Sequence, residues 1–259
     1  MRISIASYSF HGLKSAGMID VFGYLESVRY RYGLDAADIW NGLLGSDPDV
    51  YLADDSLGKI KQAMNERALT LVNYHADGCH IWEDDLAERE KHYKLAMRHL
   101  AAAASLGAKT VRIDSGGRER RWTPEQFDLI VQRYKEFAAM GANHGFRVGP
   151  ETHWGTELYA DNMEQLAGAV NHKNFGILLH LGRDAENKPD EFDRRLAPWT
   201  MHTHVDPNTI QTRLESAIRT LLDAGYQGYW SVEHGEGKNE YAIVQRQLDA
   251  VRDALKRNV

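Results

Sequence analysis

Hydrophobic residues follow two alternating patterns along the chain. Short apolar runs, typical of strands buried in a sheet, alternate with longer segments in which apolar residues recur every three or four positions, as on one face of a helix. A regular alternation of strand and helix implies parallel strands joined by right-handed crossovers. The short runs predict strands over Ile3–Ser9, Leu34–Trp40, Leu69–His75, Thr110–Asp114, Phe146–Glu151, Phe175–His180, Met201–Val205 and Tyr229–Glu233.

The segments between these strands carry signals of helix starts and ends. Thr123 and Pro124 predict a helix start, with the threonine as cap and the proline at the first helical position. One predicted helical face consists of Tyr93, Ala96, Met97, Leu100, Ala103 and Ala104. Glycines that can close a helix in the left-handed conformation stand before four of the strands, at positions Gly33, Gly107, Gly145 and Gly225.

Eight strand–helix units predict an α/β fold, a single (β/α)8 TIM barrel that spans residues 1–259 as one domain. An open, doubly wound sheet is the structural alternative, but it requires fewer or unequal units. The sixth unit has the weakest pattern, because residues 181–188 predict a loop and Lys188–Ala197 only a short helix.

Composition narrows the class of protein. The formal net charge is −6 with acidic and basic residues interspersed, which disfavours a nucleic-acid partner. The single cysteine, Cys79, cannot form an internal disulfide. The first nine residues predict a strand rather than a signal peptide, and no apolar run is long enough to span a bilayer. We therefore expect a cytoplasmic protein without a membrane partner; a homo-oligomer stays open.

Polar, metal-capable side chains gather at the carboxyl ends of the predicted strands, which form the active-site face of a parallel barrel. Glu151 and Glu233 stand out, because a carboxylate in a barrel mouth is costly unless it is paired or bound to a metal. The residues at these strand ends are Asp38, His75, Asp114, Glu151, His153, His180, His202, His204, Glu233 and His234.

Several of these residues also have a purely structural interpretation. His75 is as readily a hydrogen-bonded rim histidine as a functional one. His202 and His204 are two positions apart, so both are expected to face the barrel axis. His234 points opposite to Glu233, and we interpret it as structural.

Glu151, His180, His204 and Glu233 together form a mixed set of oxygen and nitrogen donors. Such a set suits Mn²⁺ or Zn²⁺ first, with Mg²⁺ and Fe²⁺ as alternatives, rather than a soft-metal thiolate site. Open coordination positions could hold a substrate's hydroxyl and carbonyl oxygens and stabilise an enediolate. A carboxylate on either side of the reacting carbon can remove and return a proton.

Four segments resemble the xylose isomerase-like barrels, a family that includes sugar phosphate isomerases and epimerases. Their order and spacing carry the resemblance, which covers essentially the whole chain. It implies a (β/α)8 barrel with Glu151, His204 and Glu233 as metal ligands and the two glutamates as the catalytic acid/base pair. The segments are Ser105–Arg112, Glu151–Gly155, His202–Asp206 and Gly225–Glu233.

The sixth predicted strand departs from the family's pattern of an aspartate followed three residues later by a histidine. Here the matching positions are His180 and Arg183. The resemblance implies His180 as a fourth ligand, which makes the site more positive, and Arg183 as a candidate to bind an anionic substrate oxygen. The substrate-binding candidates are Asp38, His75, His153, Trp154, Arg183 and His202.

The leading hypothesis is a metal-dependent isomerase or epimerase of a keto-sugar, with a small carbohydrate as substrate. A lyase or dehydratase acting on a keto-sugar or keto-inositol is the alternative, because both reactions begin with proton abstraction beside a carbonyl. An endonuclease IV-type DNA repair enzyme is disfavoured, since Asp114–Gly117 after the fourth strand contains no histidine. A non-catalytic barrel is the remaining hypothesis, and we favour a non-phosphorylated substrate.

Overall fold

The computed structural model describes residues 1–258, so residue 259 of the predicted domain lies outside it. Every predicted strand has an observed counterpart, and most counterparts are shorter by one or two residues at their ends. The strands are β1 (Ile3–Ile5), β2 (Ala36–Trp40), β3 (Thr70–His75), β4 (Thr110–Arg112), β5 (Arg147–Gly149), β6 (Ile177–His180), β7 (Thr200–Val205) and β8 (Trp230–Val232).

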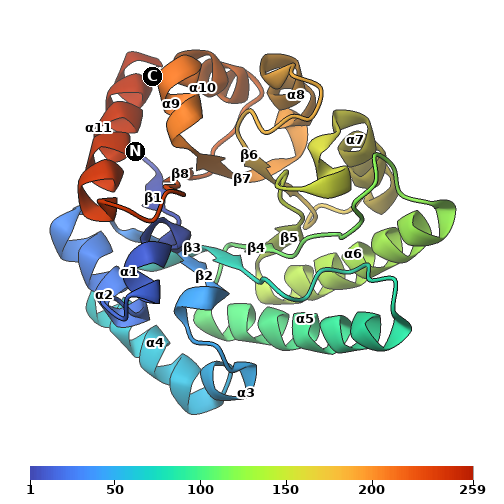
Figure 1. Cartoon of the computed structure of the whole chain (residues 1–259), viewed down its shortest axis with the longest axis horizontal. Coiled ribbons are helices and arrows are strands. Elements are labelled where there is room, and N and C mark those ends of the chain that lie inside the picture. Colours follow the sequence, from blue (N-terminus) through green and yellow to red (C-terminus); the bar gives the residue numbers. More distant parts are fainter. Residues whose placement is uncertain (259) are drawn as a thin grey trace.

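Helices surround these strands on the outside, as Figure 1 shows. None of the helices in residues 1–258 has the length and hydropathy that crossing a bilayer requires. The helices are α1 (His11–Ser15), α2 (Val21–Glu26), α3 (Pro48–Tyr51), α4 (Asp54–Glu66), α5 (Leu86–Leu106), α6 (Pro124–His144), α7 (Ala160–Val170), α8 (Pro189–Leu196), α9 (Pro207–Thr212), α10 (Leu214–Asp223) and α11 (Glu240–Asn258). Shorter helical turns are η1 (Ser7–Phe10), η2 (Ser27–Arg31), η3 (Asn41–Leu43), η4 (Gly155–Leu158) and η5 (Ala197–Trp199).

The strands form a parallel barrel. They pair in the orders β1-β8-β7-β6 and β2-β3-β4-β5, and every pair is parallel. Isolated parallel bridges join the two groups at both seams, which confirms the predicted α/β barrel and excludes the open sheet. These bridges link Ala6 with Asp38, Val148 with Phe175, and Glu151 with Leu178.

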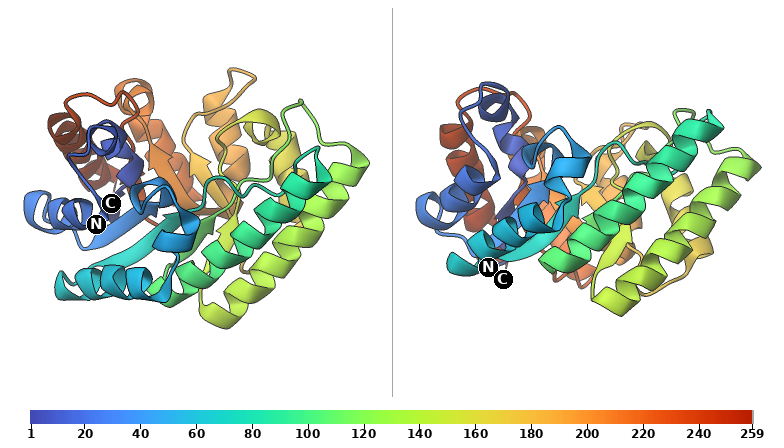
Figure 2. Two further views of the ribbon diagram at one scale, coloured as in Figure 1. Left: turned by 60° about the horizontal axis from the view of Figure 1, so that its bottom comes forward. Right: turned by 90° about the horizontal axis from the view of Figure 1, so that it is seen from below.

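The long helices α5 and α6 lie side by side outside the barrel (Figure 2). Gly107 and Gly145 end them with φ of 77° and 82°, in the left-handed region that glycine adopts without strain. Thr123 caps α6 by accepting the backbone N–H of Gln126, whose side chain accepts the N–H of Thr123 in return. The predicted start of α6 and the predicted ends of both helices are confirmed.

The first predicted strand, Ile3–Ser9, is too long. β1 ends at Ile5, and the chain turns into η1 over Ser7–Phe10. The hydroxyl of Ser7 accepts the backbone N–H of Trp40 at 2.8 Å, and that of Ser9 accepts the N–H of His234 at 3.0 Å. These serines satisfy backbone groups of other segments, which favours a turn over a continued strand.

Candidate metal centre

Glu151, His180, His204 and Glu233 converge at the carboxyl-terminal mouth of the barrel. They stand just after β5, at the end of β6, within β7 and just after β8. One donor atom from each lies within 4.8 Å of the others. Glu151 and both histidines are buried, whereas the side chain of Glu233 is 12% exposed. The barrel thus brings together the four residues that the sequence predicts as metal ligands.

Both histidines direct the same ring nitrogen towards the glutamates. Nδ1 of His180 lies 3.0 Å, and Nδ1 of His204 lies 2.8 Å, from Oε1 of Glu151. The same two nitrogens lie 3.4 and 3.7 Å from the carboxylate oxygens of Glu233. Two nitrogens and two carboxylates therefore surround a common space.

The opposite ring nitrogens of the two histidines face carboxylates. Nε2 of His180 lies 3.7 Å from Asp206, and Nε2 of His204 lies 3.5 Å from Asp38. Neither nitrogen has a hydrogen-bond partner among residues 1–258, although both are buried. Metal-binding histidines usually direct their outer N–H towards a carboxylate, which leaves the inner nitrogen free to bind the ion. This arrangement fits a divalent cation.

Charges in the cluster are strongly coupled. Burial raises the pKa of Glu151, but His204 and His153 outweigh it and hold that pKa well below its usual range. Burial lowers the pKa of His204, yet Glu151 and Glu233 raise it well above the ordinary value. The cluster therefore attracts positive charge, either as a proton on His204 or as a metal ion in its place.

A second group of polar side chains, centred on Asp38, lies deeper in the barrel. Oδ1 of Asp38 accepts hydrogen bonds from His75 at 2.5 Å and Asn73 at 3.0 Å. Oδ2 accepts from His202 at 2.8 Å and Ser231 at 2.6 Å. Burial raises the pKa of Asp38, but His75 and His202 outweigh it, so the pKa lies well below its usual range. We call these five residues the Asp38 group.

Three predicted substrate-binding residues, Asp38, His75 and His202, belong to this group. Each is at most 1% exposed, and both oxygens of Asp38 already have donors from the chain. A substrate would have to displace these bonds to reach the carboxylate. The ring of His75 also stacks on that of His204, with centroids 4.7 Å apart. This placement favours support of the ligands over direct contact with substrate.

The other predicted substrate-binding residues lie around the mouth. The side chain of His153 is 39% exposed, with Nδ1 3.7 Å from Asp114. Nε1 of Trp154 donates to Asp114 at 3.0 Å. Arg183 lies in the loop after β6, where its backbone N–H donates to the carbonyl of His180. Contact of His153, Trp154 and Arg183 with substrate stays a prediction.

Arg112, the last residue of β4, is a site residue that sequence reasoning missed. Its guanidinium lies 3.2 Å from Oε2 of Glu151, 3.1 Å from Asp114 and 2.5 Å from Asp77. The side chain is buried, so these carboxylates are needed to compensate its charge. Its position at a strand end could have marked Arg112 as a residue of the site. Only the closed barrel shows which carboxylates its guanidinium contacts.

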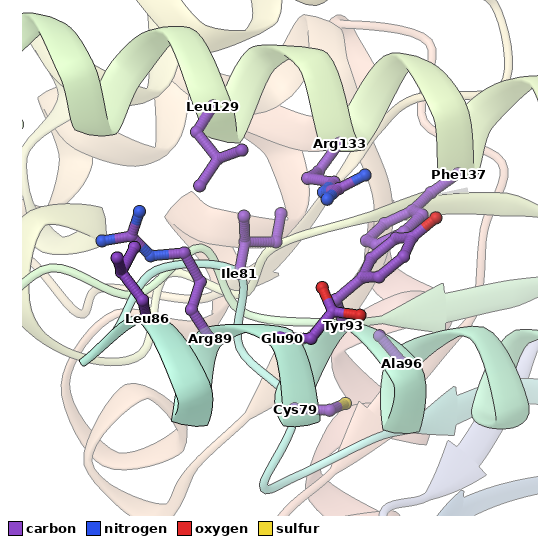
Figure 3. Close-up of a pocket in the computed structure, with 10 residues that line it drawn as sticks. All are labelled: Cys79, Ile81, Leu86, Arg89, Glu90, Tyr93, Ala96, Leu129, Arg133 and Phe137. Atoms are coloured by element: carbon purple, nitrogen blue, oxygen red, sulfur yellow. The ribbon is translucent and has the colours of Figure 1, made fainter. Parts of the chain in front are cut away.

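A cavity of about 160 Å³ lies away from these residues, between α5 and α6 (Figure 3). Leu129, Arg133 and Phe137 reach into it from α6, and Cys79 lies at its buried end. Burial raises the pKa of the Cys79 thiol. No predicted site residue lines this cavity, so the candidate chemistry stays at the strand ends.

Comparison with known proteins supports the fold. Residues 30–255 match the family model described as "Xylose isomerase-like TIM barrel". No curated protein matches the chain in sequence. Among solved structures, D-psicose 3-epimerase from Clostridium cellulolyticum H10, crystallised with D-tagatose, has a TM-score of 0.78 at 15% identity. The alignment covers 98% of this chain and 99% of that one.

Two further solved structures are similar over nearly their full lengths. The probable 3-DHS dehydratase AsbF from Bacillus anthracis has a TM-score of 0.74 at 17% identity, covering 97% of this chain and 99% of that one. A xylose isomerase-like TIM barrel protein from Mycobacterium smegmatis, in complex with magnesium, has a TM-score of 0.72 at 18% identity, covering 98% and 97%. At such identities the likeness shows a shared fold, while the reaction has to be argued from the site.

Proposed function

Because the chain belongs to the xylose isomerase-like TIM barrel family, we propose that it is a metal-dependent isomerase or epimerase of a small keto-sugar. The convergence of Glu151, His180, His204 and Glu233 at the barrel mouth carries this proposal. The two carboxylates balance the charge of a divalent ion, and the mixed donors suit Mn²⁺ or Zn²⁺, with Mg²⁺ and Fe²⁺ as alternatives.

The ligands would be Nδ1 of His180, Nδ1 of His204, Oε1 of Glu151 and an oxygen of Glu233. The bound ion would polarise the substrate carbonyl and stabilise the negative charge that develops when the neighbouring proton leaves. Asp206 behind His180 and Asp38 behind His204 would hold the two rings with their inner nitrogens unprotonated.

The two glutamates differ in their exposure and in their contacts with charged neighbours. Oε2 of Glu151 lies beside Arg112, which stabilises its negative charge and makes it a weaker base. Glu233 is more exposed, and its oxygens lie farther from both histidines than Oε1 of Glu151 does. We therefore assign removal of the substrate proton to Glu233. In epimerisation Glu151, which is ionised at rest, would first take a proton from a substrate hydroxyl or water and then deliver it to the other face of that carbon, while the proton on Glu233 returns to solvent.

Residues around the mouth would bind the rest of the sugar. His153 and Trp154 stand two and three residues after Glu151 and lie near Asp114. An aromatic ring can cover the apolar face of a sugar, while imidazole and guanidinium groups donate to its oxygens. We assign these roles to Trp154, His153 and Arg183 respectively.

The experiment is proton exchange in D₂O, with the protein reconstituted with Mn²⁺, Zn²⁺, Mg²⁺ or Fe²⁺ in turn and offered a panel of non-phosphorylated keto-sugars. Isomerase or epimerase activity places deuterium beside the carbonyl and changes configuration or carbonyl position, which NMR detects. Glu233→Gln should abolish exchange, whereas the exposed Glu236→Gln should match the native chain. Absence of exchange for every sugar with all four ions would contradict the proposal.

Elimination is the second candidate, since it starts from the same abstracted proton. The same experiment separates the two reactions by product. Loss of water with an unsaturated product would replace isomerisation by a dehydratase reaction and leave the roles of Glu233 and the metal ligands intact.

A further inference from the structure

A second cluster of metal-capable side chains lies on the loop between β3 and α5. His80 and Glu83 belong to this loop, and His92 stands in the second turn of α5. One donor atom of each lies within 4.8 Å of the others, and none of the three belongs to the central cluster. Their side chains are 24%, 35% and 14% exposed, so an ion from solvent can reach them.

The three donors share a narrow space. Nε2 of His80 lies 2.5 Å from Oε1 of Glu83, and Nδ1 of His92 lies 3.9 Å from the same oxygen. The two imidazole rings meet edge to face with centroids 4.5 Å apart. Two histidines and one glutamate form a donor set that Zn²⁺ binds in proteins, with a fourth position left for water.

Contacts around the cluster hold the donors in place. The carbonyl of Glu83 accepts the Nε–H of Arg89 at 2.8 Å, and the Arg89 guanidinium lies 3.6 Å from the ring centroid of Trp82. Nδ1 of His92 donates to the carbonyl of His80 at 3.2 Å, so in the neutral ring Nε2 keeps the lone pair for an ion. A site whose donors are already ordered loses less conformational entropy when the ion binds.

The charge of the cluster also suits a cation. The side chain of His92 is 14% exposed, and its Nδ1 lies 3.9 Å from the carboxylate of Glu83. A neutral imidazole keeps a lone pair for a metal, and the carboxylate of Glu83 supplies one negative charge.

We propose that His80, Glu83 and His92 form a second transition-metal site, for Zn²⁺ or a similar borderline divalent cation, that fastens the β3–α5 loop to α5. The site lies against the mouth of the barrel. The His80 ring meets Trp154 edge to face at 5.6 Å between centroids, and Trp154 donates to Asp114. Metal on the loop would therefore stiffen one wall of the mouth while standing apart from the central ligands.

Zinc titration of the full chain by calorimetry tests this site. His92→Gln should bind one equivalent fewer than the native chain, and Glu83→Gln should weaken the same binding event. His144→Gln, which changes an exposed histidine near the end of α6, should match the native chain. Circular dichroism checks that each variant is folded. If His92→Gln does not fold, Glu83→Gln still tests the site.

A second readout follows the loop itself. Zn²⁺ should slow proteolysis within residues 76–85 of the native chain, and should not do so in Glu83→Gln. Equal zinc stoichiometry and affinity in the native, His92→Gln and Glu83→Gln proteins would overturn the proposal. The difference between these proteins does not depend on whether the central cluster binds metal, so the two proposals fail separately.

Discussion

Two histidine–carboxylate groups lie one above the other inside the barrel, one around Glu151 and one around Asp38. In the Asp38 group both carboxylate oxygens accept hydrogen bonds from donors of the chain. In the upper cluster two histidine nitrogens crowd one oxygen of Glu151, while their outer nitrogens lack partners among residues 1–258. The same residue types are thus satisfied at one depth and unsatisfied a few ångströms nearer the mouth.

This difference separates polar residues that we expect to support the chemistry from polar residues that we expect to stabilise the barrel. A fully satisfied buried network rigidifies its surroundings, whereas two inner imidazole nitrogens directed at one carboxylate oxygen can share a bound ion with that oxygen. His204 takes part in both, because Nδ1 faces Glu151 and Nε2 faces Asp38. We therefore expect changes in the upper cluster to affect chemistry and changes in the Asp38 group to affect stability first.

The largest expected effect is on turnover, in Glu233→Gln. Loss of a general base typically lowers the rate by about 10²- to 10⁴-fold. The free energy of unfolding should change little, because the Glu233 side chain is partly exposed and its closest histidine contact is 3.4 Å. Exchange rates in D₂O and urea unfolding measure the two effects. Turnover within a few-fold of the native rate would remove Glu233 from the chemistry.

The Asp38 group should show the opposite balance. Asp38→Asn removes the carboxylate charge that accepts hydrogen bonds from the buried His75 and His202, and a hydrogen bond to a charged group contributes about 1.5–3 kcal/mol of stability. Urea unfolding at neutral pH measures this loss. Asp206→Asn is the matched control, because that carboxylate is 22% exposed and lies behind the other ligand, His180. Equal stability of the two variants would contradict the assigned difference between the groups.

A third buried histidine sharpens the comparison, because His99 has tyrosines rather than carboxylates around it. Its ring contacts the hydroxyls of Tyr74 at 2.8 Å and Tyr51 at 3.5 Å. Burial, assisted by Arg98, lowers the pKa of His99 to about 4. The folded chain therefore keeps His99 neutral at pH values where the unfolded chain, with a pKa near 6.5, binds a proton.

Stability from this residue is fully present above pH 6.5 and is lost as the pH falls from about 6.5 to about 4, by about 3 kcal/mol in total. Urea unfolding as a function of pH measures the loss. His99→Gln should flatten the slope between these pH values, whatever its effect at neutral pH. An unchanged slope would show that His99 is protonated in the folded chain.

The smallest effect is expected at the rim, in Trp154→Phe. The variant keeps an aromatic ring but loses the hydrogen bond from Nε1 to Asp114. One hydrogen bond contributes about 0.5–1.5 kcal/mol, so KM should rise roughly 2- to 10-fold with little change in kcat. Steady-state kinetics on the best keto-sugar checks this. A large fall in kcat instead would place Trp154 among the residues that position the reacting groups.

The sequence predicted the candidate ligands best where a residue's place along a strand also determines its place in the barrel. Parallel strands end at one rim, so Glu151, His180, His204 and Glu233 could be grouped from the strand ends that carry them. Depth along the barrel was harder to predict. Asp38 was expected near the end of its strand, but it lies within β2, where four donors from other segments close over it, and no spacing in the sequence shows them.

Residues that act through distant partners were missed for the same reason. The environment of Arg112 is set by its ion pairs with Asp77, Asp114 and Glu151, and the folded barrel brings these carboxylates to it. Glu157 is buried after β5, with Oε1 accepting from the backbone and hydroxyl of Ser115. Burial and the nearby Asp114 raise the pKa of Glu157 well above its usual range. A glutamate in a short helical turn such as η4 gives no sequence signal for such an environment.

Metal content of the purified protein tests the central claim most directly. We would use the His92→Gln chain, so that the loop site does not contribute, and measure bound metal after incubation with Mn²⁺, Zn²⁺, Mg²⁺ or Fe²⁺ and desalting. The account predicts about one ion per chain, as expected for a mononuclear four-ligand centre, and its loss when His180→Ala is added. Metal retained with His180→Ala would remove His180 from the ligands. No bound metal in either protein, with any of the four ions, would contradict the metal centre itself.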